Sequence, residues 1–196
     1  MNFEQSAWHL HLKNKEITFN MKRLSAGIAS LSLIIPLSLS SIGAVAAPID
    51  DAGEAYNKSV YVQAIRLFRP LAEQGNSDAQ AMLGMMYLKG EGTTRSYPDA
   101  MKWLLLASSQ GNTSALNNLG AMHFNGDGVT RNYPEAARLF RQSAAKGDKY
   151  GQTSLGSMYL NGHGVDKDVK EAVKWYRLAA ASGDVNAVNA LKRLNQ

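Results

Sequence analysis

Ser143 and Lys146 have the residue types and the spacing of an acyl-transfer nucleophile and its base. In such a Ser-x-x-Lys motif, the lysine amine can take the proton of the attacking hydroxyl group. The Ser-Asp-Asn and Lys-Thr-Gly motifs that accompany it in serine enzymes of this type are absent. Ser143 also stands 36 residues from both Ala107 and Ala179, at a position expected to pack between helices. We therefore predict no catalytic residue and a protein that is not an enzyme.

Histidines and carboxylates are the next candidates, as ligands of a metal ion. His163 lies in a glycine-flanked loop, and Glu91 and Asp127 stand at the equivalent positions of two earlier loops. If each loop belongs to a separate packed layer, these side chains lie about 10 Å apart, too far to share one ion. His123 falls at a tyrosine position and is expected to pack against the core. With no cysteine, disulfides, thiolate catalysis and cysteine-bound zinc are excluded. We predict no metal site and no cofactor.

Glycine pairs and positive charge could indicate phosphate or nucleic-acid binding. The pairs Gly90/Gly92, Gly126/Gly128 and Gly162/Gly164 have no Gly-Lys-Ser/Thr after them and no expected strand before them, so we interpret them as turns. The net charge is +5, but lysine and arginine form no dense cluster. We predict no nucleic-acid partner.

Residues 21–46 have the three parts of a secretory signal peptide: Met-Lys-Arg, a long apolar run, and small residues at the end. Cleavage is expected between Ala46 and Ala47. Residues 1–20 are then interpreted as upstream of a true start at Met21, although a long basic leader is an alternative. The run is also long enough for a membrane anchor, but six serines and Pro36 interrupt it. We expect an exported protein, in the periplasm or secreted, with membrane contact only if the signal is retained.

The rest of the chain is organised by a repeat of 36 residues, which indicates a solenoid. Single glycines, Leu-Gly pairs and alanines recur at this step: Gly75, Gly111, Gly147 and Gly183; Leu83-Gly84, Leu119-Gly120 and Leu155-Gly156; Ala100, Ala136 and Ala172.

Each unit is predicted to contain two helices. The first runs from about Asp78 to Leu88 and buries Ala79, Leu83 and Tyr87, at a spacing of four residues. Proline opens the second helix, and the glycine of the 36-residue step ends it. We expect this helix to bury Ala100, Trp103, Leu104 and Ala107 in one unit, and Ala172, Trp175, Tyr176 and Ala179 in another. Glycine inside the first helix implies close helix approach, opposite the small residues 100, 136 and 172.

The repeat divides residues 47–196 into five segments. Residues 52–75 form a shorter first unit, and residues 76–111, 112–147 and 148–183 form three full units. Residues 184–196 are expected to form a capping helix with a polar outer side.

The pattern Ala-x3-Leu-Gly-x2-Tyr-x2-Gly-x-Gly, followed by Ala-x2-Trp-x3-Ala and a closing Gly, resembles the Sel1-like repeat. Residues 79–111 and 151–183 carry it well, whereas residues 115–147 have His123 for Tyr, Leu139 for Trp and Ser143 for Ala. Residues 52–75 are more similar to the related tetratricopeptide repeat. The resemblance implies an all-α fold, an α/α solenoid forming a right-handed superhelix with a concave groove. It also implies an adaptor role in bacterial envelope processes, signalling or host contact.

By analogy with tetratricopeptide repeats, a protein or peptide partner is expected in the groove, on non-core positions of the first helices. Phe124 is its largest apolar side chain, and the alternative for this residue is that it covers a helix–loop junction. The expected groove residues are Ala81, Met85, Lys89, Asn117, Ala121, Phe124, Asn125, Thr153, Ser157 and Asn161.

Two other functions are weighed against a binding scaffold. A cysteine-rich branch of the family is linked to β-lactam hydrolysis or binding, but this chain lacks every cysteine. A membrane-tethered assembly subunit would require an uncleaved signal. The identity of the partner and the oligomeric state are left open.

Overall fold

The computed structural model describes residues 49–194, and this range is all-helical. The predicted signal peptide, its cleavage site at Ala46 and Ala47, and residues 1–20 lie outside the described residues. The helices are α1 (Ile49–Asn57), α2 (Tyr61–Glu73), α3 (Ser77–Lys89), α4 (Tyr97–Ser109), α5 (Thr113–Asn125), α6 (Tyr133–Ala145), α7 (Lys149–Asn161), α8 (Val169–Ala181) and α9 (Val185–Leu194).

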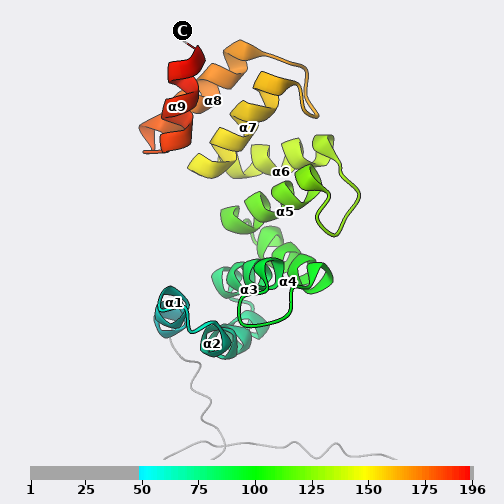
Figure 1. Ribbon diagram of the computed structural model, residues 1–196, viewed down its shortest axis with the longest axis vertical. Coiled ribbons are helices and arrows are strands. Elements are labelled where there is room, and N and C mark those ends of the chain that lie inside the picture. Colours follow the sequence, from blue (N-terminus) through cyan, green and yellow to red (C-terminus); the bar gives the residue numbers. More distant parts are fainter. Residues whose placement is uncertain (1–48, 195–196) are drawn as a thin grey trace, which may run out of the picture. The chain divides into compact units, whose positions relative to one another are not determined.

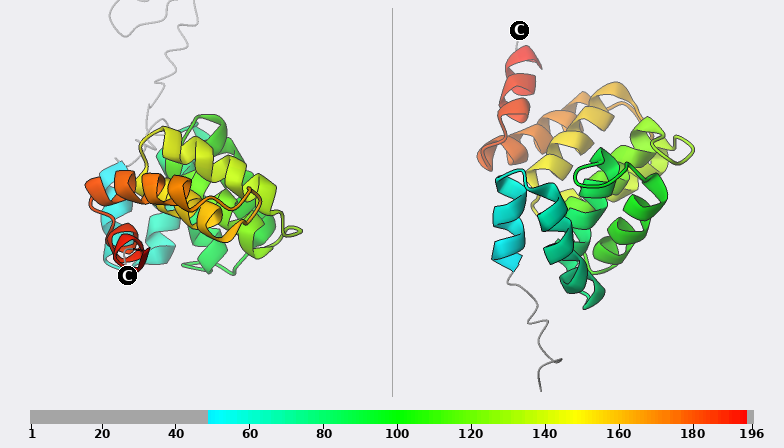
Figure 2. Two further views of the ribbon diagram at one scale, coloured as in Figure 1. Left: turned by 90° about the horizontal axis from the view of Figure 1, so that it is seen from above. Right: turned by 60° about the horizontal axis from the view of Figure 1, so that its bottom comes forward.

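Each helix packs against the helix before it and the helix after it. The helices therefore follow one another in chain order from α1 to α9 (Figures 1 and 2). The first helices of successive full units, α3, α5 and α7, also touch one another. This is an α/α solenoid, and the predicted fold class is confirmed.

The turn between units combines a glycine with an N-capping residue. Gly111 has φ +78°, and its N–H donates to the Ser108 carbonyl, while the Asn112 N–H donates to the Ala107 carbonyl at 3.2 Å. These bonds satisfy the last carbonyls of α4. The Asn112 side chain then accepts a hydrogen bond from the Ala115 N–H and begins α5. This N-capping Asn or Asp recurs every 36 residues, as Asn76, Asn112, Asp148 and Asp184. Its capping role was not recognised from the sequence.

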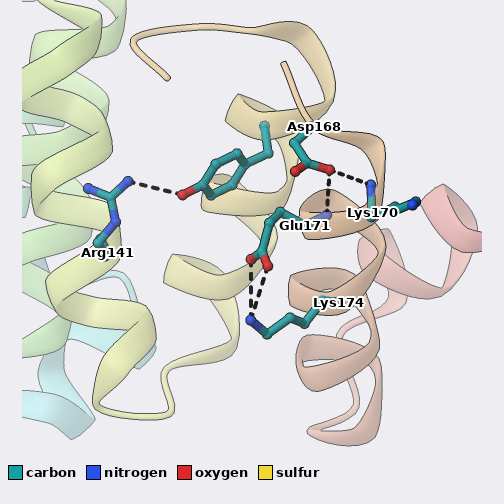
Figure 3. Close-up of polar contacts among 6 residues, drawn as sticks. Arg141, Asp168, Lys170, Glu171 and Lys174 are labelled. Atoms are coloured by element: carbon teal, nitrogen blue, oxygen red, sulfur yellow. Dashed lines mark hydrogen bonds and ion pairs between the residues drawn. The ribbon is translucent and has the colours of Figure 1, made fainter. Parts of the chain in front are cut away.

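The second helices of the three full units, α4, α6 and α8, begin with their own N-caps. Ser96, Asn132 and Asp168 each accept hydrogen bonds from N–H groups of the first turn. Figure 3 shows Asp168 at the start of α8, with Glu171 and Lys174 paired one turn further on. Prolines at 98 and 134 occupy the first turn as predicted, where a missing N–H has no cost.

The core consists of the predicted columns of small and large apolar residues. Leu83, Leu104, Leu119 and Leu155 are almost completely buried, and the alanine column at 100, 136 and 172 is fully buried. Tyr87 and Trp175 depart from the prediction because they are only partly buried. Both lie at the edge of their apolar clusters, where one side of the ring remains accessible.

The glycines inside the first helices lie where two helices approach closely, as predicted. However, the group they accommodate is chiefly a large side chain of the second helix. A Cβ atom on Gly84 would lie 2.5 Å from Leu104 Cγ, and one on Gly120 would lie 2.7 Å from Phe140 Cε1. At Gly156 the nearest atoms belong to the Tyr176 ring, at 3.0 Å. Glycine therefore leaves room for one bulky residue in each unit.

Candidate partner-binding surface

Nine of the ten expected groove residues form three rows across α3, α5 and α7, and Phe124 lies beside them. Within each helix, the members of the rows are four residues apart and so share one face. Ala81 is buried, whereas Lys89, Asn125 and Asn161 are exposed. The remaining members are partly buried: Met85, Asn117, Ala121, Phe124, Thr153 and Ser157.

The row formed by Ala81, Asn117 and Thr153 holds neighbouring units together. Ala81 is 4% exposed and belongs to a core cluster with Leu104 of its own unit and Leu116 of the next, so its side chain is not accessible to a partner. The Asn117 amide donates to Asp148 Oδ1 at 2.8 Å. The expectation that Ala81 lines the groove is therefore wrong, because its side chain belongs to a core cluster that includes Leu116 and Leu119 of α5.

Asp148 is the carboxylate that Asn117 of this row contacts. Burial acts to raise the pKa of its carboxyl group, but hydrogen bonds from the Gly151 N–H, Asn117 and Thr113 outweigh it, and the pKa is lowered. The carboxylate therefore remains charged at the N-terminus of α7, where it also interacts favourably with the helix dipole. Asp148 positions α7 against α5, and this role was not recognised from the sequence.

Phe124 covers the junction between α5, α6 and the loop of the next unit, as in the alternative considered for it. Its ring centroid lies 5.1 Å from that of Tyr133 and 5.5 Å from that of His163. His163 stacks on Tyr133 at 4.8 Å, and the Arg131 guanidinium lies 5.4 Å from the Tyr133 centroid. The contacts of Phe124 are thus mainly structural, although part of its ring is accessible.

The other two rows are the accessible part of the face. Met85, Ala121 and Ser157 form the middle row, and Lys89, Asn125 and Asn161 form the end row near the loops. The end row carries one cation: Lys89 Nζ lies 3.4 Å from Tyr56 Oη and 3.7 Å from Glu91 Oε1. Asn125 Nδ2 donates a hydrogen bond to Asp127 Oδ2, and Asn161 Nδ2 donates one to the Ser157 carbonyl. A small, largely uncharged surface with free amide oxygens suits backbone contacts with a peptide or helix.

Ser143 is 0% exposed and lies beside Gly151 of α7, so it is not accessible to a substrate. Its hydroxyl approaches the Thr113 carbonyl at 3.5 Å. Among residues 49–194, no group of three or more metal-binding side chains comes together, and no helix has both the length and the apolarity to cross a bilayer.

Comparison with known proteins agrees with this architecture. The Sel1 repeat family model matches residues 53–76, 77–112, 113–148 and 149–184. A protective antigen of uropathogenic Escherichia coli, c5321, which displays an SLR fold, is 39% identical with a TM-score of 0.64, over 67% of this chain and 28% of that one. A Sel1 repeat protein from Oxalobacter formigenes is 33% identical with a TM-score of 0.66, over 71% and 57% of the two chains.

A third solved structure, cysteine-rich protein B of Helicobacter pylori, shares the fold at 22% identity. Its TM-score is 0.51, and the match covers 73% of this chain and 96% of that one. No curated protein matches the sequence. The chain spans less than two thirds of the first two relatives, at 28% and 57% of their lengths.

Four consecutive matches to one family model cover most of the described helices, and the helices pair in the same order as the repeats. Proteins with these repeats are typically scaffolds for protein–protein interaction and are generally not catalytic. The chain belongs to the Sel1 repeat family.

Proposed function

We propose that this protein is an exported scaffold that binds a protein or peptide partner on the accessible face of α3, α5 and α7. The observation that supports this proposal is the contact between these three helices, which makes two rows of residues continuous across three units. The rows consist of Met85, Ala121 and Ser157, and of Lys89, Asn125 and Asn161. The binding face is therefore smaller than the sequence predicted, because Ala81 is buried and Phe124 is mostly occupied by its neighbours.

Export is the second part of the proposal, with the periplasm as the expected compartment and full secretion as the alternative. Its support is the order of a basic start, an apolar run and Ala44-Val45-Ala46 in residues 21–46. We expect the exported protein to begin at Ala47, because alanines at 44 and 46 fit the small pockets of the peptidase. Intact mass and N-terminal sequencing check this. An exported chain that still contained Leu33 would instead indicate a membrane-tethered protein.

Partner binding on the first-helix face is tested by Asn125→Arg combined with Asn161→Arg. Both asparagines are exposed, and such surface changes usually alter stability by no more than about 0.5 kcal/mol. Two new cations at the end row should nevertheless weaken binding, through steric conflict and desolvation at the interface. The measurement compares what wild-type and variant protein retain from an envelope extract, with circular dichroism to verify folding.

The matched control is Asn57→Arg combined with Asn186→Arg. These asparagines are also exposed, but they lie on α1 and α9, outside the three helices that carry the two rows. We expect this control to retain the same partner as the wild-type protein. If the folded variant at 125 and 161 retained that partner as well as the control did, the proposed face would be wrong.

A further inference from the structure

A cleft outside the first-helix face opens between α4, α5 and α6. Its volume is 230 Å³, and Leu105 at its edge is 52% exposed. The lining residues are Met101, Leu105, Ser108 and Ser109 of α4; Leu116, Leu119 and His123 of α5; and Glu135, Arg138, Leu139 and Gln142 of α6.

The cleft lies where residues 105–139 differ from the equivalent positions of other units in the same chain. Four lining residues stand at positions that are filled identically 36 residues earlier and 36 residues later. Leu105 replaces Arg69 and Arg141, Leu116 replaces Gln80 and Gln152, His123 replaces Tyr87 and Tyr159, and Leu139 replaces Trp103 and Trp175.

In the neighbouring units, the equivalent space is occupied by an arginine–tyrosine hydrogen bond and an indole ring. Arg69 Nη2 donates to Tyr87 Oη at 2.9 Å. Arg141 of α6 donates to Tyr159 Oη of α7 at 3.2 Å (Figure 3). Leu105 and His123 cannot form this bond, and the smaller Leu139 stands where the other units have the indole ring of Trp103 or Trp175. The four replacements therefore open one site together, although they are spread over 35 residues of sequence.

The walls of the cleft are apolar and its rim is polar. Leu105, Leu116, Leu119 and Leu139 supply apolar surface, and hydroxyl groups and Gln142 lie around it. Arg138 holds both carboxylate oxygens of Glu135, at 2.6 Å and 2.8 Å, so the charges at the rim are largely matched.

The size of the cleft favours a single side chain of a partner. Pockets for small-molecule ligands usually measure about 300–1,000 Å³, which is larger than this cleft. Apolar cavities of about 150 Å³ hold a benzene ring, so one indole ring can enter here. Tryptophan is also one of the residue types enriched at binding hot spots, which lie in desolvated pockets. In two adjacent units the chain's own Trp103 and Trp175 stand at the position of Leu139.

The charge of the surrounding surface favours an acidic partner segment. The helices α4 and α6, which line the cleft, carry the cations Lys102, Arg138 and Arg141, and Lys146 follows α6 beside Gly111 at the end of α4. Their carboxylates are Asp99 and Glu135, and Glu135 is already paired with Arg138.

We propose that this cleft binds one tryptophan side chain of a protein partner, in a segment whose flanking residues are acidic. This site lies on α4 and α6 as well as α5, and is separate from the two accessible rows on α3, α5 and α7. The proposal for the cleft can therefore be tested independently of the function proposed for those rows.

The test is a titration of the ¹⁵N-labelled protein with a blocked peptide, Asp-Glu-Trp-Glu-Asp. The full chain is expressed, and the protein is purified in the processed form that accumulates. We expect saturable shifts of amide signals from residues lining the cleft, with a Kd of about 1 mM or below. The peptide with glycine for tryptophan should bind at least about tenfold more weakly, and so should the peptide with lysine for each acidic residue.

Two variants close the cleft with residues that the chain already uses in adjacent units. They are Leu139→Trp and the combination of Leu105→Arg with His123→Tyr. Each should lower peptide affinity at least about tenfold while circular dichroism and the melting temperature stay near wild-type values. Because the variants fill the site by different means, either one that folds tests the proposal.

Three outcomes would overturn it. Wild-type affinity in a folded, closed-cleft variant would show that the peptide binds elsewhere, and so would shifts confined to α3 and α7. No saturable shift at about 5 mM peptide would show that the cleft does not recognise this segment. Self-association of the wild-type protein that Leu139→Trp abolishes would identify a second copy of the chain as the occupant.

Discussion

Gly164→Ala is expected to destabilise the protein by roughly 3 kcal/mol or more. Gly164 has φ +69°, and a side chain in this left-handed conformation costs about 1–2 kcal/mol. A Cβ atom at this position would also overlap the Tyr133 carbonyl group and lie 2.5 Å from the Pro134 nitrogen. Backbone atoms at the start of α6 cannot move aside as a flexible side chain can. Urea denaturation followed by circular dichroism measures the loss.

Gly147→Ala separates the two contributions. Gly147 has φ +83°, but no atom lies within 4 Å of the position of its Cβ atom. We therefore expect this control to lose only about 1–2 kcal/mol, from the conformation alone. Equal losses of stability in the two variants would show that the Gly164 loop is not in close contact with the start of α6.

The same loop contact recurs in each unit. A Cβ atom on Gly128 would overlap Tyr97, and one on Gly92 would lie 2.6 Å from the Tyr61 carbonyl carbon. The second glycine of each loop therefore lets one unit fit onto the second helix of the unit before it. Because neighbouring units share a core in this way, a destabilising substitution in one loop should lower the stability of both units.

Gly120→Val is expected to lower the free energy of unfolding by about 1–3 kcal/mol. Gly120 lies inside α5, and its Cβ atom would be 2.7 Å from Phe140 Cε1 and 3.0 Å from two further ring atoms. Phe140 is itself buried, so its ring has little room to move. The clash outweighs the gain in helix propensity, which is only about 0.5 kcal/mol for valine over glycine. Thermal and urea denaturation measure the change.

Gly53→Val is the matched control for this variant. Gly53 also lies inside a helix, α1, but no atom lies within 4 Å of its Cβ position. We expect this change to be neutral or slightly stabilising, because only helix propensity differs. Phe140→Leu combined with Gly120→Val should recover part of the lost stability, since the smaller side chain removes the clash. Additive losses in the double variant would contradict the assigned contact.

The partner-binding face could be predicted only in part from the sequence. The first helices and their shared face follow from residues four apart, such as Met85 and Lys89. Which of these residues are accessible depends on packing with other helices: Ala81 is buried in a core that includes α5, and Phe124 is surrounded by Tyr133 of α6 and His163 of the next unit. The cleft between α4, α5 and α6 was not predicted, although the replacements at His123 and Leu139 were visible as departures from the repeat.

The sequence by itself determined the all-helical repeat and the family. Glycines such as Gly111 and Gly147 recur every 36 residues because each unit ends in the same left-handed turn, and Leu83, Leu119 and Leu155 recur because each unit buries the same face. These are local properties, so spacing along the chain reveals them.

Only the tertiary structure decided which positions far apart in the sequence meet. Leu105, His123 and Leu139 belong to three different helices, and they form one cleft because packing brings α4, α5 and α6 together. Gly164 and Tyr133 are likewise 31 residues apart in sequence, and a close fit between units makes glycine necessary there. A repeat fixes the order of its units, but the space between two units depends on the volumes of side chains from both, which no single stretch of sequence contains.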